Sequence, residues 1–570
     1  MFRLCTVLLV LAGSQALMGD PPLPLAEEET AEVSWGGRTF HYLPRYQYPD
    51  PPLAKNQGEP LLFQRNPEEI ALRSVPQPDE LLTRLDKLAF PGEFCGLYFS
   101  IHAPVALEVQ EIDTSSLGEG WEVFEVVHLP RIKRPPFYQI IPERLDDFQA
   151  RTIPAGRNCI IYLRRKIPAR LAGAALAGDL KVHCAGRQPL TLPVQIRVTP
   201  FALEQPAAHW LMYTAVNYLP YQKKADKIRF LQEIKDIGIT GIIHHGGLWS
   251  QRAVQTLSEI LNAAELDGPV IIDFGSGLEQ KIIRDLTGKG VANSRKVPYD
   301  ECADPRVAEQ FVRFLQDFSL WMEQYRPGRQ WLYQGIDEPH INGLMAQAQW
   351  EYPLARQAGV KTSATVYPYA SVKDFGNLLD VALNNFPAHS PAKAQPFREL
   401  GQERKIAFWG IMGGSYTGQQ GYLAANRLRA GFLFLKSGMP ASAYWSYSVY
   451  QNEQTSGKTS YCLAYKREDT SKRMCDSTLQ AESLREGIQD YKVAAMLRQL
   501  LEQARENGQA EAAGTSQAVL DYVINDLTPW ADECIMASDT RAKRNIDNAQ
   551  LENMRLALVA EIIRLKGVLK

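Results

Sequence analysis

Two adjacent carboxylates, Asp337 and Glu338, have the spacing best suited to acid–base chemistry in this sequence. They lie at the end of the run 331–337, which we predict to be a strand. Mutual repulsion and partial desolvation would raise the pKa of one carboxyl group, which could then act as a general acid, while the other stays ionised and stabilises positive charge. Pro339 is expected to restrict Glu338 to an extended conformation, so that both side chains reach the same opening. The alternative is that Asp337 only caps a helix over 341–359.

Aromatic, amide and acidic residues end the other predicted strands. They are Tyr213, Asn217, His244, His245, Asp273, Tyr367, Tyr369, Asn384, Asn385, Trp409, Trp445 and Tyr447. Flat rings suit the apolar faces of a sugar, and amides and carboxylates suit its hydroxyl groups, so the set indicates a carbohydrate site, although any single member is more often a core residue. Neighbours on a strand cannot both face one ion, so the two histidines do not predict a metal site. We expect neither a metal nor a cofactor.

A retaining glycosidase ordinarily needs a second carboxylate as its nucleophile. The stretch 406–417, at the end of the seventh predicted strand, contains no acid, which leaves Asp273 as the candidate. The other possibility is that the nucleophile belongs to the substrate. A 2-acetamido sugar can attack its own anomeric carbon through the acetamido oxygen, and an adjacent Asp–Glu pair would fit that mechanism.

Strands that alternate with amphipathic helices must position these residues. The predicted strands cover 209–215, 239–244, 269–273, 331–337, 361–366, 381–384, 406–411 and 442–445. Helical patterns follow them, most clearly over 311–322 and 422–436. Eight such units in about 300 residues predict a (β/α)8 TIM barrel over 206–504, with the active site at the carboxyl ends of its strands.

The residues before and after the barrel have different patterns. Short β-prone runs at 94–102, 121–128, 159–164, 180–184 and 190–198 predict an antiparallel β-sandwich over 17–205, although 20–78 is rich in proline and weakly periodic. The segment 505–570 predicts a short helical extension. Its last part carries Leu551, Met554, Leu558 and Ile562 on one helix face, which we expect to pack on the barrel.

Composition excludes several classes of protein. The chain has 570 residues, 45% of them hydrophobic and 22% charged, so it is not mainly disordered or a coiled coil. Its net charge of -2 provides no field that would attract nucleic acid or an anionic membrane. The expected partner is a glycan or glycoconjugate, and the sequence does not determine the oligomeric state.

The N-terminus resembles an export signal. A basic start, an apolar run over 4–12 and small residues at 14 and 16 predict a signal peptide over 1–16, and hence a periplasmic or secreted protein without a membrane segment after cleavage. Of the cysteines that remain, Cys159 with Cys184 and Cys462 with Cys475 could form disulfides. Buried unpaired thiols are the equally weighted alternative.

Three segments together resemble glycoside hydrolase family 123, a group of β-N-acetylgalactosaminidases. They are 174–203, the Asp337-Glu338-Pro339 signature and the helix 482–491, within a resemblance that covers roughly 155–505. The resemblance implies that Glu338 is the general acid/base and that Asp337 holds the acetamido group. Arg485 and Glu486 are expected to form a structural ion pair beneath the barrel. A conventional glycosidase on another glycan, or a carbohydrate-binding barrel without catalysis, remains the alternative.

Overall fold

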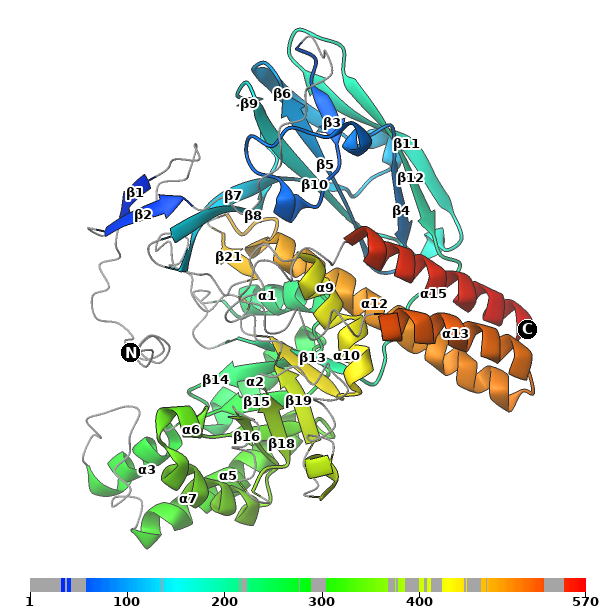
Figure 1. Cartoon of the computed structure of the whole chain (residues 1–570). Helices are drawn as coiled ribbons and strands as arrows, with labels where there is room; N and C mark the ends of the chain where they lie inside the picture. The colour runs from blue at the N-terminus through cyan, green and yellow to red at the C-terminus, as the bar shows by residue number, and fades with distance from the viewer. Residues whose placement is uncertain are drawn as a thin grey trace.

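The computed structural model describes residues 32–35, 38–42, 58–134, 137–214, 216, 223–275, 277–288, 304–366, 375, 378–384, 399–403, 407–411, 423–444, 447, 463–467, 469–526 and 548–569. The predicted signal peptide lies outside these residues. Within them the chain forms two N-terminal sheets, a closed parallel barrel and a group of C-terminal helices (Figure 1).

The N-terminal part is a sandwich of two mainly antiparallel sheets. The first has the order β1 (Glu32–Trp35), β2 (Arg38–Tyr42), β8 (Phe137–Asp147), β7 (Glu122–Arg134), β10 (Arg157–Lys166), β5 (Phe94–Ala103) and β3 (Leu61–Phe63). The second has the order β4 (Leu85–Ala89), β12 (Leu190–Val198), β11 (Ala175–Cys184), β6 (Leu107–Asp113) and β9 (Arg151–Ile153). Among the described strands of these two sheets, only β2 with β8 and β4 with β12 pair in parallel.

The inward residues of the two sheets form one apolar core. Phe99, Ile161 and Val182 are completely buried in it. Cys159 and Cys184 lie in the same core as free, buried thiols, so the proposed bridge between them is absent and the alternative holds. Cys462 lies outside the described residues.

Eight parallel strands close the barrel, as the sequence predicted. They are β13 (His209–Tyr213), β14 (Gly241–His245), β15 (Val270–Asp273), β16 (Trp331–Gln334), β17 (Thr362–Val366), β18 (Val381–Asn384), β19 (Ala407–Ile411) and β20 (Ala441–Tyr444). Leu211, Ile243, Ile271 and Leu332 fill the interior, whereas their strand neighbours pack against the helices. This alternation follows from the two-residue period of a strand.

Helices surround the barrel in the order α1 (Lys224–Asp236), α2 (Gln251–Ala263), α3 (Gly277–Thr287), α5 (Pro305–Tyr325), α6 (Pro339–Asn342), α7 (Met345–Gln357), α9 (Leu423–Ala430), α10 (Phe432–Ser437) and α12 (Leu479–Glu506). The apolar face predicted over 311–322 lies in α5. The single helix predicted over 422–436 is divided at Gly431. A Cβ atom on Gly431 would lie 2.6 Å from the carbonyl oxygen of Gly487 in α12, so glycine permits this close approach.

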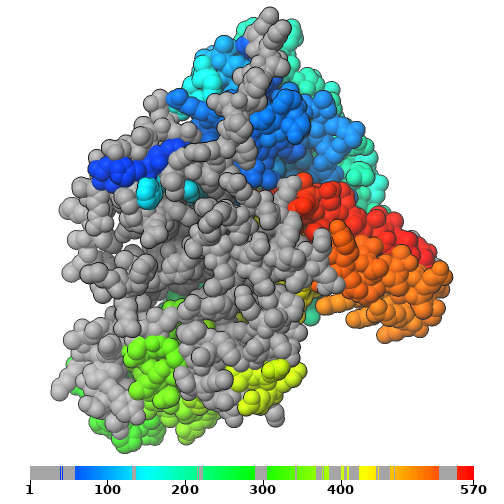
Figure 2. All heavy atoms as spheres, viewed as in Figure 1, coloured from blue at the N-terminus to red at the C-terminus, as the bar shows by residue number. Residues whose placement is uncertain are grey.

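In the described part of the C-terminal extension, α13 (Ala510–Asp526) and α15 (Asn548–Val568) pack on α12. Leu551, Leu558 and Ile562 are buried, as their spacing predicted, while Met554 is only partly buried. In Figure 2 both helices form a ridge beside the sandwich. A two-stranded sheet, β21 (Ala464–Lys466) with β22 (Cys475–Ser477), precedes α12. No helix among the described residues has the length and apolar content that crossing a bilayer requires.

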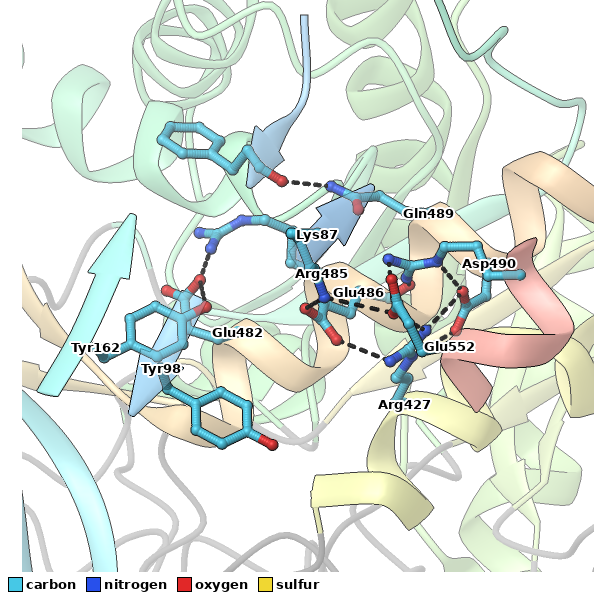
Figure 3. A network of polar contacts seen from close by, with 12 residues as sticks. Lys87, Tyr98, Tyr162, Arg427, Glu482, Arg485, Glu486, Gln489, Asp490 and Glu552 are labelled. Atoms are coloured by element: carbon cyan, nitrogen blue, oxygen red, sulfur yellow. Dashed lines mark hydrogen bonds and ion pairs between the residues drawn. The ribbon is translucent and has the colours of Figure 1, made fainter. Parts of the chain in front are cut away.

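A set of buried and partly buried charged residues joins the three parts, and we call it the junction network. It comprises Lys87 of β4, Arg427 of α9, Glu486 and Asp490 of α12 and Glu552 of α15, which are labelled in Figure 3, together with Arg555 of α15. Asp490 pairs with Arg427 Nε at 2.7 Å and with Arg555 Nε at 2.5 Å. Glu486 pairs with Lys87 at 3.1 Å and with Arg427 at 3.0 Å. One helix, α12, therefore contacts sandwich, barrel and extension through charge.

The prediction that Arg485 and Glu486 form an ion pair with each other is wrong. Arg485 pairs with Glu482 one turn earlier, whereas Glu486 faces the junction network. Successive side chains on a helix diverge, and those three or four residues apart meet. Glu482 also accepts hydrogen bonds from Arg164 at 2.8 Å and from Tyr162 at 3.2 Å, both on β10 of the sandwich.

Candidate active site

A row of polar side chains crosses the carboxyl ends of three neighbouring strands. His245 of β14 is in register with Asp273 of β15, and Asp273 is in register with Gln334 of β16. Each lies two residues beyond an interior core residue, so by strand alternation all three point into the barrel. The register therefore places a polar layer above the apolar filling of the barrel.

His245 and Asp273 form an ion pair in this layer, with His245 Nδ1 2.7 Å from Asp273 Oδ2. The other oxygen of Asp273 accepts the backbone N–H of Gly275 at 2.9 Å. Burial disfavours the charged form of His245, but Asp273, and to a smaller extent Asp337, raise its pKa. Asp273 is 4% exposed and holds contacts through both of its oxygens.

Asp337 and Glu338 follow β16 beyond the loop residues Gly335 and Ile336. Glu338 is half-buried, and Asp337 keeps an exposed face. Desolvation, followed by repulsion from Asp273 and Glu338, raises the pKa of Asp337 to about 7, an effect that solvent at its exposed face partly screens. Desolvation also raises the pKa of Glu338. Two adjacent carboxyl groups with raised pKa values at a barrel mouth are candidates for proton transfer.

The backbone of Glu338 differs from the prediction. Its φ of 44° and ψ of 53° lie in the left-handed region, not the extended one. The chain must turn from the end of β16 directly into α6, whose first residue is Pro339, and the left-handed conformation makes this turn. Such a conformation costs a non-glycine residue about 1–2 kcal/mol and is commonly found at functional sites.

The capping alternative for Asp337 is also not what the structure shows. Glu338 occupies the N-cap position of α6 and its side chain makes no capping hydrogen bond, while Leu344 precedes α7. Asp337 instead faces the side chain of Thr365 in β17. Its side chain thus contributes to the barrel mouth.

Tyr213 and Trp409 lie at the barrel interior, and Tyr213 is near Asp337. The Tyr213 ring is 5.5 Å from the ring of His245, and its pKa is raised well above the ordinary value, first by burial and then by Asp337. Trp409 packs with Tyr213 in the interior cluster. Thr365 and Gln334, which the sequence analysis missed, face the Tyr213 hydroxyl. Strand alternation, applied to every polar residue at a strand end, would have found them.

Two predicted residues lie in the packing around the barrel. His244 is completely buried, and burial lowers its pKa to about 3. Tyr447 is buried, with its ring 5.2 Å from Phe230 of α1. Asn217, Tyr367, Tyr369, Asn385, Trp445 and the side chain of Asn384 lie outside the described residues. In the described part of the chain, no three His, Cys, Asp or Glu residues gather as metal ligands.

The fold has a counterpart among solved structures. A family 123 glycoside hydrolase from Clostridium perfringens, studied for glycolipid glycan hydrolysis, matches with a TM-score of 0.61 at 12% identity, over 85% of this chain and 96% of that one.

Other matches are much looser. A Bacteroides ovatus GH5 xyloglucanase matches with a TM-score of 0.29 at 9% identity, over 72% of this chain and 98% of that one. A Rhizomucor miehei endo-1,4-β-mannanase matches with a TM-score of 0.32 at 10% identity, over 50% and 94%. No family model matches the sequence, and no curated protein does. The resemblance to glycoside hydrolase family 123 is therefore confirmed at the level of the fold, a sandwich followed by a TIM barrel.

Proposed function

We propose that the protein is an exported glycoside hydrolase that releases β-linked N-acetylhexosamine, with N-acetylgalactosamine favoured, by a retaining, substrate-assisted mechanism. The observation that carries the proposal is the arrangement of three carboxylates at the mouth. Asp337 and Glu338 are adjacent with raised pKa values, while Asp273 is engaged with His245 and Gly275. The fold shared with a family 123 enzyme supports the same reaction class.

In this mechanism Glu338 donates a proton to the glycosidic oxygen as the bond to the anomeric carbon breaks. The acetamido oxygen of the substrate attacks that carbon from the opposite face. Asp337 accepts a hydrogen bond from the acetamido N–H and stabilises the positive charge that develops on the acetamido group. Glu338 then removes a proton from the water that opens the cyclic intermediate, so the configuration is retained. Desolvation at Glu338 suits this role, because it favours the protonated form before the reaction.

A conventional mechanism would instead require Asp273 as the nucleophile. Asp273 would have to leave its ion pair with His245 to attack a sugar, and its second oxygen holds the backbone of Gly275. These contacts favour a positioning role for Asp273. They make the substrate-assisted reaction the better-supported one.

The test is hydrolysis of matched aryl β-glycosides with and without a 2-acetamido group. We expect turnover only of the acetamido substrates, and loss of most of that activity in Glu338→Gln and Asp337→Asn. Glu309→Gln, at an exposed position on α5, is the matched control and should retain full activity. Turnover of sugars without the acetamido group would favour the two-carboxylate mechanism. Glycan binding without any hydrolysis would indicate a non-catalytic barrel.

Export is a separate part of the proposal. The sequence pattern over 1–16 supports it. Mass spectrometry of the full-length protein produced in a Gram-negative host should find a mature chain that begins at residue 17 outside the cytoplasm. An uncleaved chain in the cytoplasm would contradict export and leave the reaction untouched.

A further inference from the structure

A second pair of carboxyl groups lies behind the loop that carries Asp337 and Glu338. Glu279 of α3 and Glu351 of α7 are both completely buried, and desolvation raises the pKa of each carboxyl group. Carboxyl groups buried side by side are costly, because ionisation loses hydration and two charges repel. Two carboxyl groups therefore occupy core positions that apolar side chains usually fill, and such departures are expected at functional sites.

Glu351 directly contacts the backbone that leads to Asp337. A Cβ atom on Gly335 would lie 1.1 Å from Glu351 Oε1, so the carboxyl group lies against the backbone of Gly335. The backbone N–H of Ile336 faces the same carboxyl group. Tyr333, the third residue of β16, donates its hydroxyl to Glu351 Oε1 at 2.7 Å. Three residues before the proposed catalytic pair therefore converge on one side chain.

The loop needs such support because Glu338 holds a left-handed backbone. Conformations of this kind persist only where the surrounding structure imposes them. After Glu338, the carbonyl of Pro339 accepts the backbone N–H of Leu344 at 2.8 Å, which fixes the chain on that side. Before it, the buried carboxyl group of Glu351 contacts Gly335 and Ile336.

We propose that Glu351 is the positioning residue of the catalytic loop, a role that rests on the proposed function of Asp337 and Glu338. Its carboxyl group, which accepts the Tyr333 hydroxyl, presents an oxygen acceptor to the loop and fixes where the two reacting carboxylates lie. A misplacement of about 1 Å in such groups can lower a rate about 100-fold. Glu351 itself does not touch the substrate.

The test compares Glu351→Gln, which keeps an oxygen acceptor, with Glu351→Met, which removes it at similar volume. In Glu351→Met we expect a 10- to 100-fold lower kcat with little change in KM, and faster hydrogen exchange in the peptide that covers 333–340. Glu351→Gln should restore both towards the wild type. Glu309→Gln serves again as the control at an exposed site.

Hydrogen exchange separates this proposal from the proposed function. If the wild type hydrolyses no glycoside, the proposed function is overturned. Faster exchange at 333–340 in Glu351→Met would still support the positioning role of Glu351. Unchanged exchange and kcat in a folded Glu351→Met would overturn positioning, as would a change in KM alone or a Glu351→Gln that behaves like Glu351→Met. If Glu351→Met does not fold, Tyr333→Phe removes only the hydroxyl and keeps the ring stacked on Phe274. It should then give a smaller change of the same kind, and no change would overturn the proposal.

Discussion

Replacing Asp490 by Asn tests the junction network at its centre. Asp490 is completely buried and accepts hydrogen bonds from Arg427 at 2.7 and 3.1 Å and from Arg555 at 2.5 Å. Asparagine keeps the shape but removes the negative charge between two buried guanidinium groups. Breaking a buried ion pair from one side typically costs 3–5 kcal/mol. We expect about 3 kcal/mol, the low end, because Glu486 and Glu552 still neutralise Arg427.

The assay is urea unfolding followed by circular dichroism. The control is Glu259→Gln, which removes an ion pair with Lys224 in which both side chains are exposed, and no measurable loss is expected there. If Asp490→Asn were as stable as this control, the network would add nothing to the stability of the fold. The account of α12 as the element that joins the three parts through charge would then be refuted.

Three further outcomes are expected. Gly487→Ala should lower the free energy of unfolding in urea by about 1–3 kcal/mol, because the new Cβ would lie 2.3 Å from the carbonyl oxygen of Arg427. An unchanged urea midpoint would show that α9 and α12 move apart without cost. Burial alone would raise the pKa values of Glu486 and Glu552, but their ion pairs lower them. The two carboxylates therefore contribute to the free energy of unfolding above the unfolded-state pKa of about 4.3, and this contribution is lost as the pH falls. Tm should therefore fall between about pH 5 and 3, and a flat Tm would contradict this. The pH profile of kcat/KM should change near pH 7, where Asp337 titrates, and this change should be absent from the residual activity of Asp337→Asn. If the change near pH 7 remains in Asp337→Asn, another group causes it.

The eight barrel strands were predictable because each is a short apolar run followed by a helical pattern, and the structure places every one within three residues of its predicted ends. The same rule located Tyr213, His245 and Asp273, since parallel strands bring their carboxyl ends to one face of the barrel. Thr365 was not among the predicted residues because the prediction rested on aromatic, amide and acidic side chains and not on strand position alone. Its hydroxyl is small, and its role follows only from its neighbours.

The sequence did not predict the backbone conformation of Glu338 or the ion pairs between distant parts of the chain. The residue before a proline is usually extended, but at Glu338 the tertiary turn from strand to helix overrides that local preference. Lys87 and Glu486 are 399 residues apart, so no local pattern could pair them. The position of Glu351 beneath Gly335 likewise depends on how α7 docks against β16.

The 28-residue helix α12 has a consequence for how the chain behaves as a whole. Because it contributes buried residues to the barrel, the sandwich and the C-terminal extension alike, none of these parts can be excised with an intact surface of its own. Cutting after the barrel would remove Arg555 and Glu552, and would expose Asp490 and Arg427, which pair with them in the assembled fold. We therefore expect the three parts, although separate in shape, to unfold together rather than one at a time.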